Sequence, residues 1–407
     1  MLGQNSGVGT LLKQVHSSVY TIGCPCHLIH ITANKAADSL PISVEDIVIT
    51  IYYYLESSRR KRSLQKFQEL YSVEFQKIIK HVHTQWLSLG KSLKRILLHW
   101  DALYEFFKSE VSNQQNKVVS AKRKFHNYHV CGDPNTKLYF LFLDGVLPIF
   151  EDTNKVLQSD EPLTHALHET LNKLRGILVR FVKPDIIRSN DFAECNHKTS
   201  GMIMIGHSTE QYIKDNRPQL YLAKFFKCVV SFYVTTCQCM KKKFPYNDPV
   251  LLHAEVANIK RREQVSFQSV EYFVNQFPAL LPTCENTPEQ LDELQNEFFL
   301  YQVDSEIDTM SVHRIDHAWV ILNKKYKVSS DAMLGILVIL HSNADCDRVF
   351  SIVTKNQTAF CSNMSLQLLE SLLIKKINNH GVCYEQKHLE DLLKAAKKAT
   401  YAALHDD

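Results

Sequence analysis

Apolar residues recur along most of this chain at intervals of three and four, which is the spacing of one face of a helix. Such a face runs from Val44 to Leu55, and Ser43 stands before it as the expected N-cap. From Leu163 to Phe181 the apolar residues recur at intervals of four or three, as in helices that pack side by side. Residues Thr287 to Gln290 form a capping box that opens another helix. The pattern predicts nearly continuous helix from Lys91 to Gln302.

Other segments differ from this helical spacing. The run from Val19 to Cys24 is rich in β-branched and aromatic residues, which favours a short strand. The stretch from Ser189 to Asp215 shows little periodicity and is expected to be a long loop. Met333 to Leu340 is continuously apolar, which fits either a buried strand or a buried helix. Ser365 is expected to cap a final helix, whose apolar face consists of Leu366, Leu369, Leu373 and Ile377.

The composition supports a helix-rich protein. The chain has 12 Gly and 12 Pro in 407 residues, well below average usage of roughly 7% and 5%. So few turn-forming residues favour long helices over a many-stranded β fold. The 47 basic and 43 acidic residues leave a net charge of +4, so any surface that binds polyanions has to be local.

Cysteine usage and the length of the apolar stretches indicate the cellular compartment of the protein. The 11 cysteines are scattered and odd in number, which fits reduced thiols inside a cell better than a disulfide framework. The residues after Met1 show no basic region followed by an apolar one, so no signal peptide is expected. The most apolar stretch, Leu138 to Leu143, is too short to span a bilayer. We therefore expect a soluble intracellular protein without a membrane partner.

Two clusters carry residue types that bind metals. Cys24, Cys26, His27 and His30 include the ligand types of zinc, but adjacent residues point in different directions, so we expect a structural role and no bound metal. Asp331, Asp345 and Asp347 could hold magnesium, although solvated aspartates are far commoner. The sequence has no Gly-rich phosphate loop, nucleophile elbow or His-Glu-x-x-His helix, so the common enzyme signatures are absent.

Basic clusters are the remaining candidates for binding. They are Arg59, Arg60, Lys61 and Arg62, then Lys122 to Lys124, and then Lys241 to Lys243. One interpretation is that they are solvated helix ends. The other is that they contact phosphates or serve as a nuclear-import signal.

Three stretches, taken in order, resemble elements of the hAT superfamily of transposases (the hobo and Activator type). Cys24 and His27 resemble its Cys-x-x-His element, which follows the second catalytic aspartate. Thr84, Trp86 and Ser88 resemble its Thr-Arg-Trp-Asn-Ser element at the start of a helical insertion. The most specific match is the C-terminal signature Ser-x-Ala-x-x-Glu-Arg-x-Phe-Ser. Five of its six defining positions agree here, namely Ser342, Ala344, Arg348, Phe350 and Ser351.

This resemblance implies an α/β fold that is rich in helix, with an incomplete ribonuclease-H-like core interrupted by a large all-α insertion. It divides the chain into residues 1–90 as a remnant of that core, 91–305 as the insertion, and 306–407 as the end of the core with the dimerisation region. Family members use three carboxylates and two Mg or Mn ions to attack a phosphodiester. The family aromatic that stacks on a DNA base would correspond to Trp86, which could equally be a buried core residue.

Departures from the family indicate that catalysis is lost. Both catalytic aspartates should precede Cys24, yet no Asp occurs before Asp38. Asp347 stands where the third acid should be Glu, and its shorter side chain sets the carboxylate back by more than the roughly 0.5 Å that a metal site tolerates. The zinc-finger DNA reader that is typical of the family is not found either.

We therefore expect a degenerate or domesticated hAT-derived protein that is catalytically inactive, needs no cofactor and lies in the nucleus. It would self-associate as a homodimer or higher oligomer through the face of Leu366, Leu369, Leu373 and Ile377. DNA is a further candidate partner, with Trp86 and residues Arg59 to Arg62 as the contacts. Two alternatives remain: a fragment of an active DNA transposase, or a helical scaffold for protein interactions.

Overall fold

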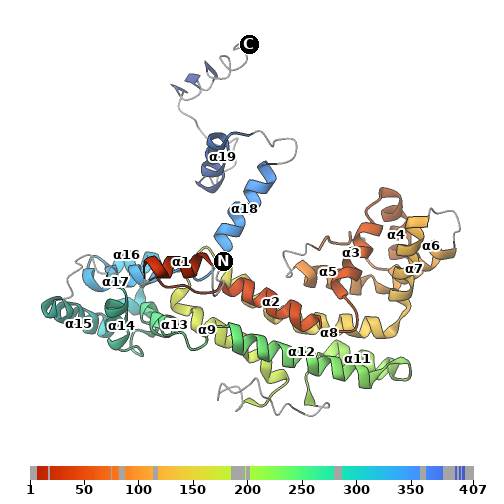
Figure 1. Ribbon diagram of the computed structural model, residues 1–407, viewed down its shortest axis with the longest axis horizontal. Helices are drawn as coiled ribbons and strands as arrows, with labels where there is room; N and C mark the ends of the chain where they lie inside the picture. Colours follow the sequence, from red (N-terminus) through yellow and green to blue (C-terminus); the bar gives the residue numbers. More distant parts are fainter. Residues whose placement is uncertain are drawn as a thin grey trace. The chain divides into compact units, whose positions relative to one another are not determined.

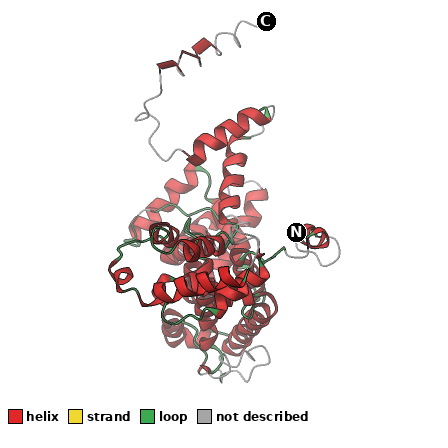
Figure 2. Ribbon diagram, turned by 90° about the vertical axis from the view of Figure 1, so that its left-hand side faces the viewer, coloured by secondary structure: helices red, strands yellow, loops and turns green. Residues whose placement is uncertain are grey.

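A computed structural model describes residues 7–16, 19–74, 76–81, 88–112, 118–184, 198, 202–278, 287–357 and 364–378, with a few residues between 390 and 398. Over these ranges the chain forms helices and connecting loops, and no β-strand is present (Figure 2). The chain divides into two compact units, Met1–Asn343 and Ala344–Asp407.

The expected α/β class with an incomplete ribonuclease-H-like core is therefore wrong. Val19–Cys24, predicted as a strand, is irregular, and most of Met333–Leu340 continues the helix Lys327–Leu337. A strand needs a neighbouring strand to satisfy its backbone groups, whereas a helix satisfies them locally. Local β propensity without such a neighbour does not make a strand. The division at residues 90/91 and 305/306 stays a prediction.

The first unit begins with a series of helices, among them the one that the apolar periodicity predicts from Val44. Ser43 accepts a hydrogen bond from the Asp46 backbone N–H at 3.2 Å, which confirms the expected N-cap. The helices up to the middle of this unit are α1 (Val8–Val15), α2 (Pro25–Ala37), α3 (Val44–Tyr54), α4 (Ser58–Leu70), α5 (Ser88–Leu98), α6 (Trp100–Ser112), α7 (Val118–Gly132), α8 (Pro134–Leu157), α9 (Thr164–Arg175), α11 (His207–Asn216) and α12 (Leu222–Lys243).

Helices α2, α8 and α12 form the centre of a large hydrophobic core and lie side by side (Figure 1). Phe142 of α8 makes edge-on contacts with Phe225 and Phe232 of α12, with ring centroids 6.0 and 5.3 Å apart. Such aromatic pairs add to the free energy gained by burial. Ile22 and Cys24, which precede α2, pack against this core.

A second hydrophobic core lies in the C-terminal part of the same unit. Its centre is Trp319, which is fully buried and donates a hydrogen bond to the Ala257 carbonyl at 2.8 Å. Thr287 accepts from the Gln290 backbone N–H at 3.4 Å, so the predicted capping box is confirmed at its N-cap. The helices here are α13 (Pro249–His253), α14 (Gln268–Gln276), α15 (Pro288–Val303), α16 (Ile315–Leu322) and α17 (Lys327–Leu337).

One predicted loop contains a helix. Helix α11 begins at His207, inside the range Ser189–Asp215, and ends at Asn216; Gly206 before it has φ +94°, a conformation that favours glycine. Thr209 is the buried residue of this helix. A helix that buries so little of its own surface leaves a weak periodic signal, which explains why the pattern missed it.

The second unit contains α18 (Ala344–Asn356) and α19 (Leu366–Asn378), which pack on each other. Ser365 accepts from the Leu368 backbone N–H at 3.2 Å, which confirms this predicted cap. Ala344 is buried in α18, and no residue of α19 is buried. The two helices thus lack a hydrophobic core of their own.

Candidate functional site

The structure brings together two sequence motifs that lie 319 positions apart. The Asn343 backbone N–H donates to Cys24 Sγ at 3.4 Å. Ser342 Oγ donates to the Leu157 carbonyl at 2.7 Å, and Cys26 Sγ contacts that same oxygen at 3.7 Å. The end of α8 therefore joins the start of α2 to residues 342–343. We call Cys24, Cys26, Ser342 and Asn343 the Cys24 cluster.

Polar contacts continue around this cluster. His30 Nε2 lies 3.1 Å from Asn154 Nδ2 of α8. His341 Nδ1 accepts from the Leu163 backbone N–H at 3.4 Å. His27 is exposed, and its ring centroid lies 6.5 Å from that of His30. These contacts connect α2, α8 and α9 to the end of the first unit.

Cys24 has a strongly perturbed thiol. A hydrogen bond from Cys26 lowers the pKa of the Cys24 thiol to about 4, against the opposing effect of burial. The His27 side chain and the backbone N–H groups of Asn343 and His27 act in the same direction as Cys26. Cys24 is also the N-cap residue of α2, where the helix dipole favours a negative charge. The Cys24 side chain is therefore a thiolate at neutral pH.

His165, near this cluster, also has a lowered pKa, but the effect is to keep its side chain uncharged. Burial, with a smaller contribution from His341, lowers the pKa of His165 to about 4. The His165 imidazole is therefore neutral at physiological pH. Within the described ranges, no three His, Cys, Asp or Glu side chains are placed so that they could share a metal ion.

The first basic cluster lies in the opening turns of α4. Arg59, Lys61 and Arg62 are exposed. Arg60 is half-buried: its guanidinium lies 4.0 Å from the Tyr54 ring centroid, and Nη1 donates to the Tyr54 carbonyl at 3.0 Å. Arg60 thus fixes the start of α4, and the other three residues of the cluster face solvent.

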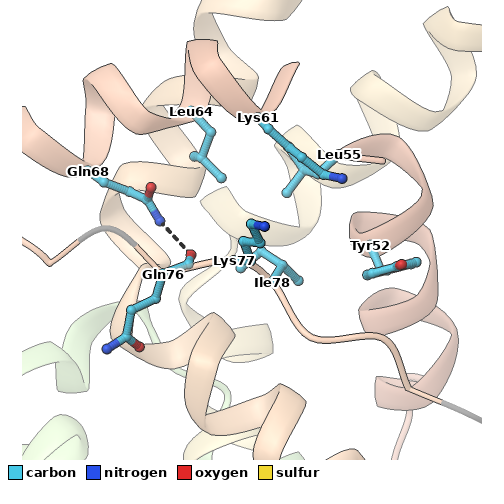
Figure 3. Close-up of a pocket in the computed structure, with 8 residues that line it drawn as sticks. All are labelled: Tyr52, Leu55, Lys61, Leu64, Gln68, Gln76, Lys77 and Ile78. Carbon is cyan, nitrogen blue, oxygen red and sulfur yellow. Dashed lines mark hydrogen bonds between the residues drawn. The ribbon is translucent and has the colours of Figure 1, made fainter. Parts of the chain in front are cut away.

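This cluster belongs to a longer basic segment, which we define as residues 59–95. It holds ten Lys or Arg residues and two acids, Glu69 and Glu74, a net charge of +8 against +4 for the whole chain. Lys61 of α4 and Lys77 line the same small hollow (Figure 3). The Arg95 guanidinium of α5 donates to the Lys77 carbonyl at 2.8 Å. Contacts thus connect α4, residues 76–81 and α5, although Trp86 lies outside the described residues.

The remaining predicted site residues are in the second unit. Asp347 is exposed on the first turn of α18, and Arg348 forms an ion pair with Asp345 instead of with Asp347. Phe350 is 66% exposed, and Ser351 is exposed as well.

The four residues of the predicted dimerisation face of α19 differ in their exposure to solvent. Leu366 is 82% exposed and Ile377 is 42% exposed, while Leu369 and Leu373 are half-buried. Two further apolar residues, Leu368 and Ile374, are exposed and were not predicted from the sequence. They lie outside the stripe of three-and-four spacing, so periodicity could not select them.

A group of three residues in the first unit was also not predicted from the sequence. His81 Nε2 lies 2.7 Å from Glu45 Oε1, and His81 Nδ1 lies 2.7 Å from Ser88 Oγ. The His81 side chain is fully buried. Glu45 is 36 positions before His81, and no local motif connects them, so packing alone reveals the group.

None of the helices in the described part of the chain combines the length and the apolar content needed to cross a membrane.

Comparison with known proteins does not identify a family. No protein-family model matches the sequence, and no curated protein matches it at a significant level. The resemblance to hAT transposases rests on the motif residues around Cys24, Trp86 and Ser342, and it stays a hypothesis.

Proposed function

We propose that this chain is a domesticated or degenerate hAT-derived protein without transposase catalysis, which acts by self-association through residues 344–407. The observation that carries the proposal is the apolar surface of α19, which has seven Leu or Ile residues among thirteen and buries none of them. The motif match that runs from Ser342 through Ser351 supports the family assignment. The aspartate at position 347, where the family has glutamate, supports the loss of catalysis.

Apolar residues that gather at a protein surface usually mark a place where another molecule packs. Leu366 and Ile377 lie on one side of α19, Leu368 lies opposite, and Ile374 lies between, yet all four are exposed. Helix α18 adds exposed Phe350 to the same unit. A second copy of this chain would cover such a surface, and two-fold symmetric dimers are the commonest oligomers.

The proposal is tested by the mass of the protein in solution. Light scattering of the full chain at micromolar concentration should give twice the 47.0 kDa of one chain. The variant Leu366→Glu/Ile377→Glu should give a monomer with unchanged helical circular dichroism, because it places charge on exposed apolar positions. Leu369 and Leu373 are less suitable for this test, because both are half-buried.

A matched control is Gln367→Glu/Asn378→Glu, which adds the same charge to exposed polar positions of α19. This control should remain a dimer. A monomer mass for the unaltered chain would refute self-association. A dimer that survives the Leu366/Ile377 change would place the interface elsewhere.

A second function is favoured by the basic segment. We infer that residues 59–95 contact the phosphates of double-stranded DNA, because their +8 charge exceeds that of the whole chain and Arg59, Lys61 and Arg62 are exposed. Affinity should then fall steeply with salt. Lys61→Gln/Arg62→Gln should flatten the slope of log affinity against log salt by about 0.9 for each phosphate that the two side chains neutralise.

The control for the DNA measurement is Lys224→Gln/Lys227→Gln, which removes the same charge from exposed positions of α12. It should leave the slope unchanged. Binding without salt dependence, or none at all, would favour the scaffold alternative. Nicking of DNA that needs magnesium or manganese and disappears in Asp347→Ala would favour the fragment of an active transposase.

The basic cluster Arg59 to Arg62 is also our candidate for nuclear import, and its removal should leave a fluorescent fusion in the cytoplasm.

A further inference from the structure

Three elements of the first unit place a carboxylate, an imidazole and a hydroxyl in a row. Glu45 lies in the first turn of α3, His81 lies in the irregular segment 76–81, and Ser88 is the first residue of α5. The two contacts of the His81 ring, with Glu45 Oε1 and with Ser88 Oγ, are both 2.7 Å long. This is the distance of strong hydrogen bonds between such groups.

The direction of each hydrogen bond follows from what each group can donate. A carboxylate only accepts, so His81 Nε2 carries a proton and donates it to Glu45. A neutral imidazole then has its lone pair on Nδ1, which accepts the Ser88 hydroxyl proton. Glu45 thus fixes the His81 tautomer that can act as a base toward Ser88.

This arrangement matches the chemistry of an activated serine: a nucleophile bonded to a base that a third group orients. The two ring nitrogens have exchanged their usual partners, since the carboxylate binds Nε2 here. The exchange does not alter the chemistry, because each nitrogen of the ring can carry either the proton or the lone pair. The match lies in geometry and roles, which is how such sites recur on unrelated folds.

The three residues differ in their access to solvent. His81 is fully buried, which keeps its ring in place, while Ser88 is half-exposed. Glu45 lines a hollow of about 150 Å³, and so does Leu89, which follows Ser88 in the sequence. A cavity of about that volume accepts a molecule the size of benzene. Asp38 also lines it, so an anionic group would be disfavoured there.

We propose that Ser88 is the nucleophile of an acyl-transfer site that takes small uncharged esters, with His81 as its general base and Glu45 as the residue that orients His81. The backbone N–H groups in the first turn of α5, where Ser88 begins the helix, would favour the negative charge that develops on the carbonyl oxygen. This activity is separate from the proposed self-association.

In the first half of the reaction, Ser88 Oγ bonds to the carbonyl carbon while its proton moves to His81 Nδ1, and Glu45 stabilises the imidazolium. The bond from that carbon to the ester oxygen then breaks, and the leaving alkoxide takes the Nδ1 proton and departs as an alcohol. Water attacks the acyl-serine with His81 as base, which releases the carboxylic acid and restores the Ser88 hydroxyl.

The test uses the full chain and a fluorophosphonate probe, which phosphonylates activated serines with loss of fluoride. Peptide mass spectrometry of the folded protein should locate the label on Ser88, and Ser88→Ala should lose it. His81→Gln should slow labelling by about 100-fold or more, as expected when a general base is removed. Glu45→Gln should slow it as well, because the carboxamide can donate to Nε2 and thereby favour the wrong tautomer.

Controls separate activation from simple exposure. Ser112→Ala removes an exposed hydroxyl at the end of α6 and should leave labelling unchanged. Ser88→Cys should add an iodoacetamide label at position 88, located by peptide mass spectrometry, and that reaction should again depend on His81. Labelling of Ser88 that is equal in the unaltered chain and in His81→Gln would overturn the proposal. So would the absence of label on Ser88 in the folded chain, which would show that the three residues only connect α3 to α5.

Discussion

At the scale of the residue, the fold gives different properties to side chains that look equal in the sequence. Cys24 and Cys131 are both cysteines of the first unit. Hydrogen bonds from Cys26 and neighbouring groups lower the pKa of Cys24 to about 4, whereas burial raises the pKa of Cys131 to about 12. A structural role for the Cys24 motif could be expected from the sequence, but the Asn343 contact could not, because it lies 319 positions away.

Cys24 should react with iodoacetamide at a rate that changes little between pH 6 and 8. The thiolate is the reacting species, and Cys24 is already ionised across this range because its pKa in the fold is about 4. In urea-unfolded chain the same residue should behave as an ordinary thiol with a pKa of about 8.5, so its rate should rise about tenfold for each pH unit. Peptide mass spectrometry of quenched samples measures both rates. A rate in the folded chain that rises as steeply as in the unfolded one would contradict the thiolate.

At the scale of the element, features that depend on residues nearby in the sequence were predicted correctly, and features that depend on distant residues were not. The N-caps Ser43, Thr287 and Ser365 all accept the expected backbone hydrogen bonds, because capping depends on residues three positions away. The strand expected at Val19–Cys24 failed, because strand formation depends on a partner that the local sequence does not reveal. Met333–Leu340 shows the same limit, since a short apolar run fits a buried strand and a buried helix equally well.

Two glycines at the ends of helices should respond differently to alanine. Gly206, before α11, has φ +94°, so Gly206→Ala should destabilise the protein by about 1–2 kcal/mol. Gly176, after α9, has helical φ −57° and an open space around its Cα. Gly176→Ala should therefore be neutral or stabilising by about 0.4–1 kcal/mol.

Urea denaturation followed by circular dichroism measures this difference between Gly206→Ala and Gly176→Ala. Equal effects of the two substitutions would show that the positive φ is not maintained in solution. Gly176→Ala serves as the control, because it makes the same chemical change where the backbone already suits an L-residue.

At the scale of the molecule, the helical character was predictable but the fold class was not. Low glycine and proline content and the three-and-four spacing both indicate helix, and the described chain is helical. The α/β class came from the motif resemblance and is contradicted by the absence of strands in the described ranges. The contacts that define candidate sites, such as Asn343 with Cys24 and His81 with Glu45, depend on packing between distant segments. Spacing along the chain carries no information about such contacts.

The division of the chain into two units leads to a prediction about truncation. Both hydrophobic cores lie within residues 1–343, and Ser342 and Asn343 complete their contacts with Leu157 and Cys24 inside that unit. The exposed apolar residues of α19 lie in the other unit. A chain that ends at Asn343 should therefore keep its helices and become monomeric, because it retains its cores and lacks the surface that drives association.

Circular dichroism and light scattering at the same micromolar concentration measure both properties of the chain that ends at Asn343. A control chain that ends at Asn378 keeps α18 and α19 and should remain a dimer, since the apolar positions from Leu366 to Ile377 are intact. A dimer formed by residues 1–343 would place the interface in the first unit. Loss of helical signal in the shorter chain would mean that α18 and α19 stabilise the cores, and their apolar residues would then serve folding within one chain.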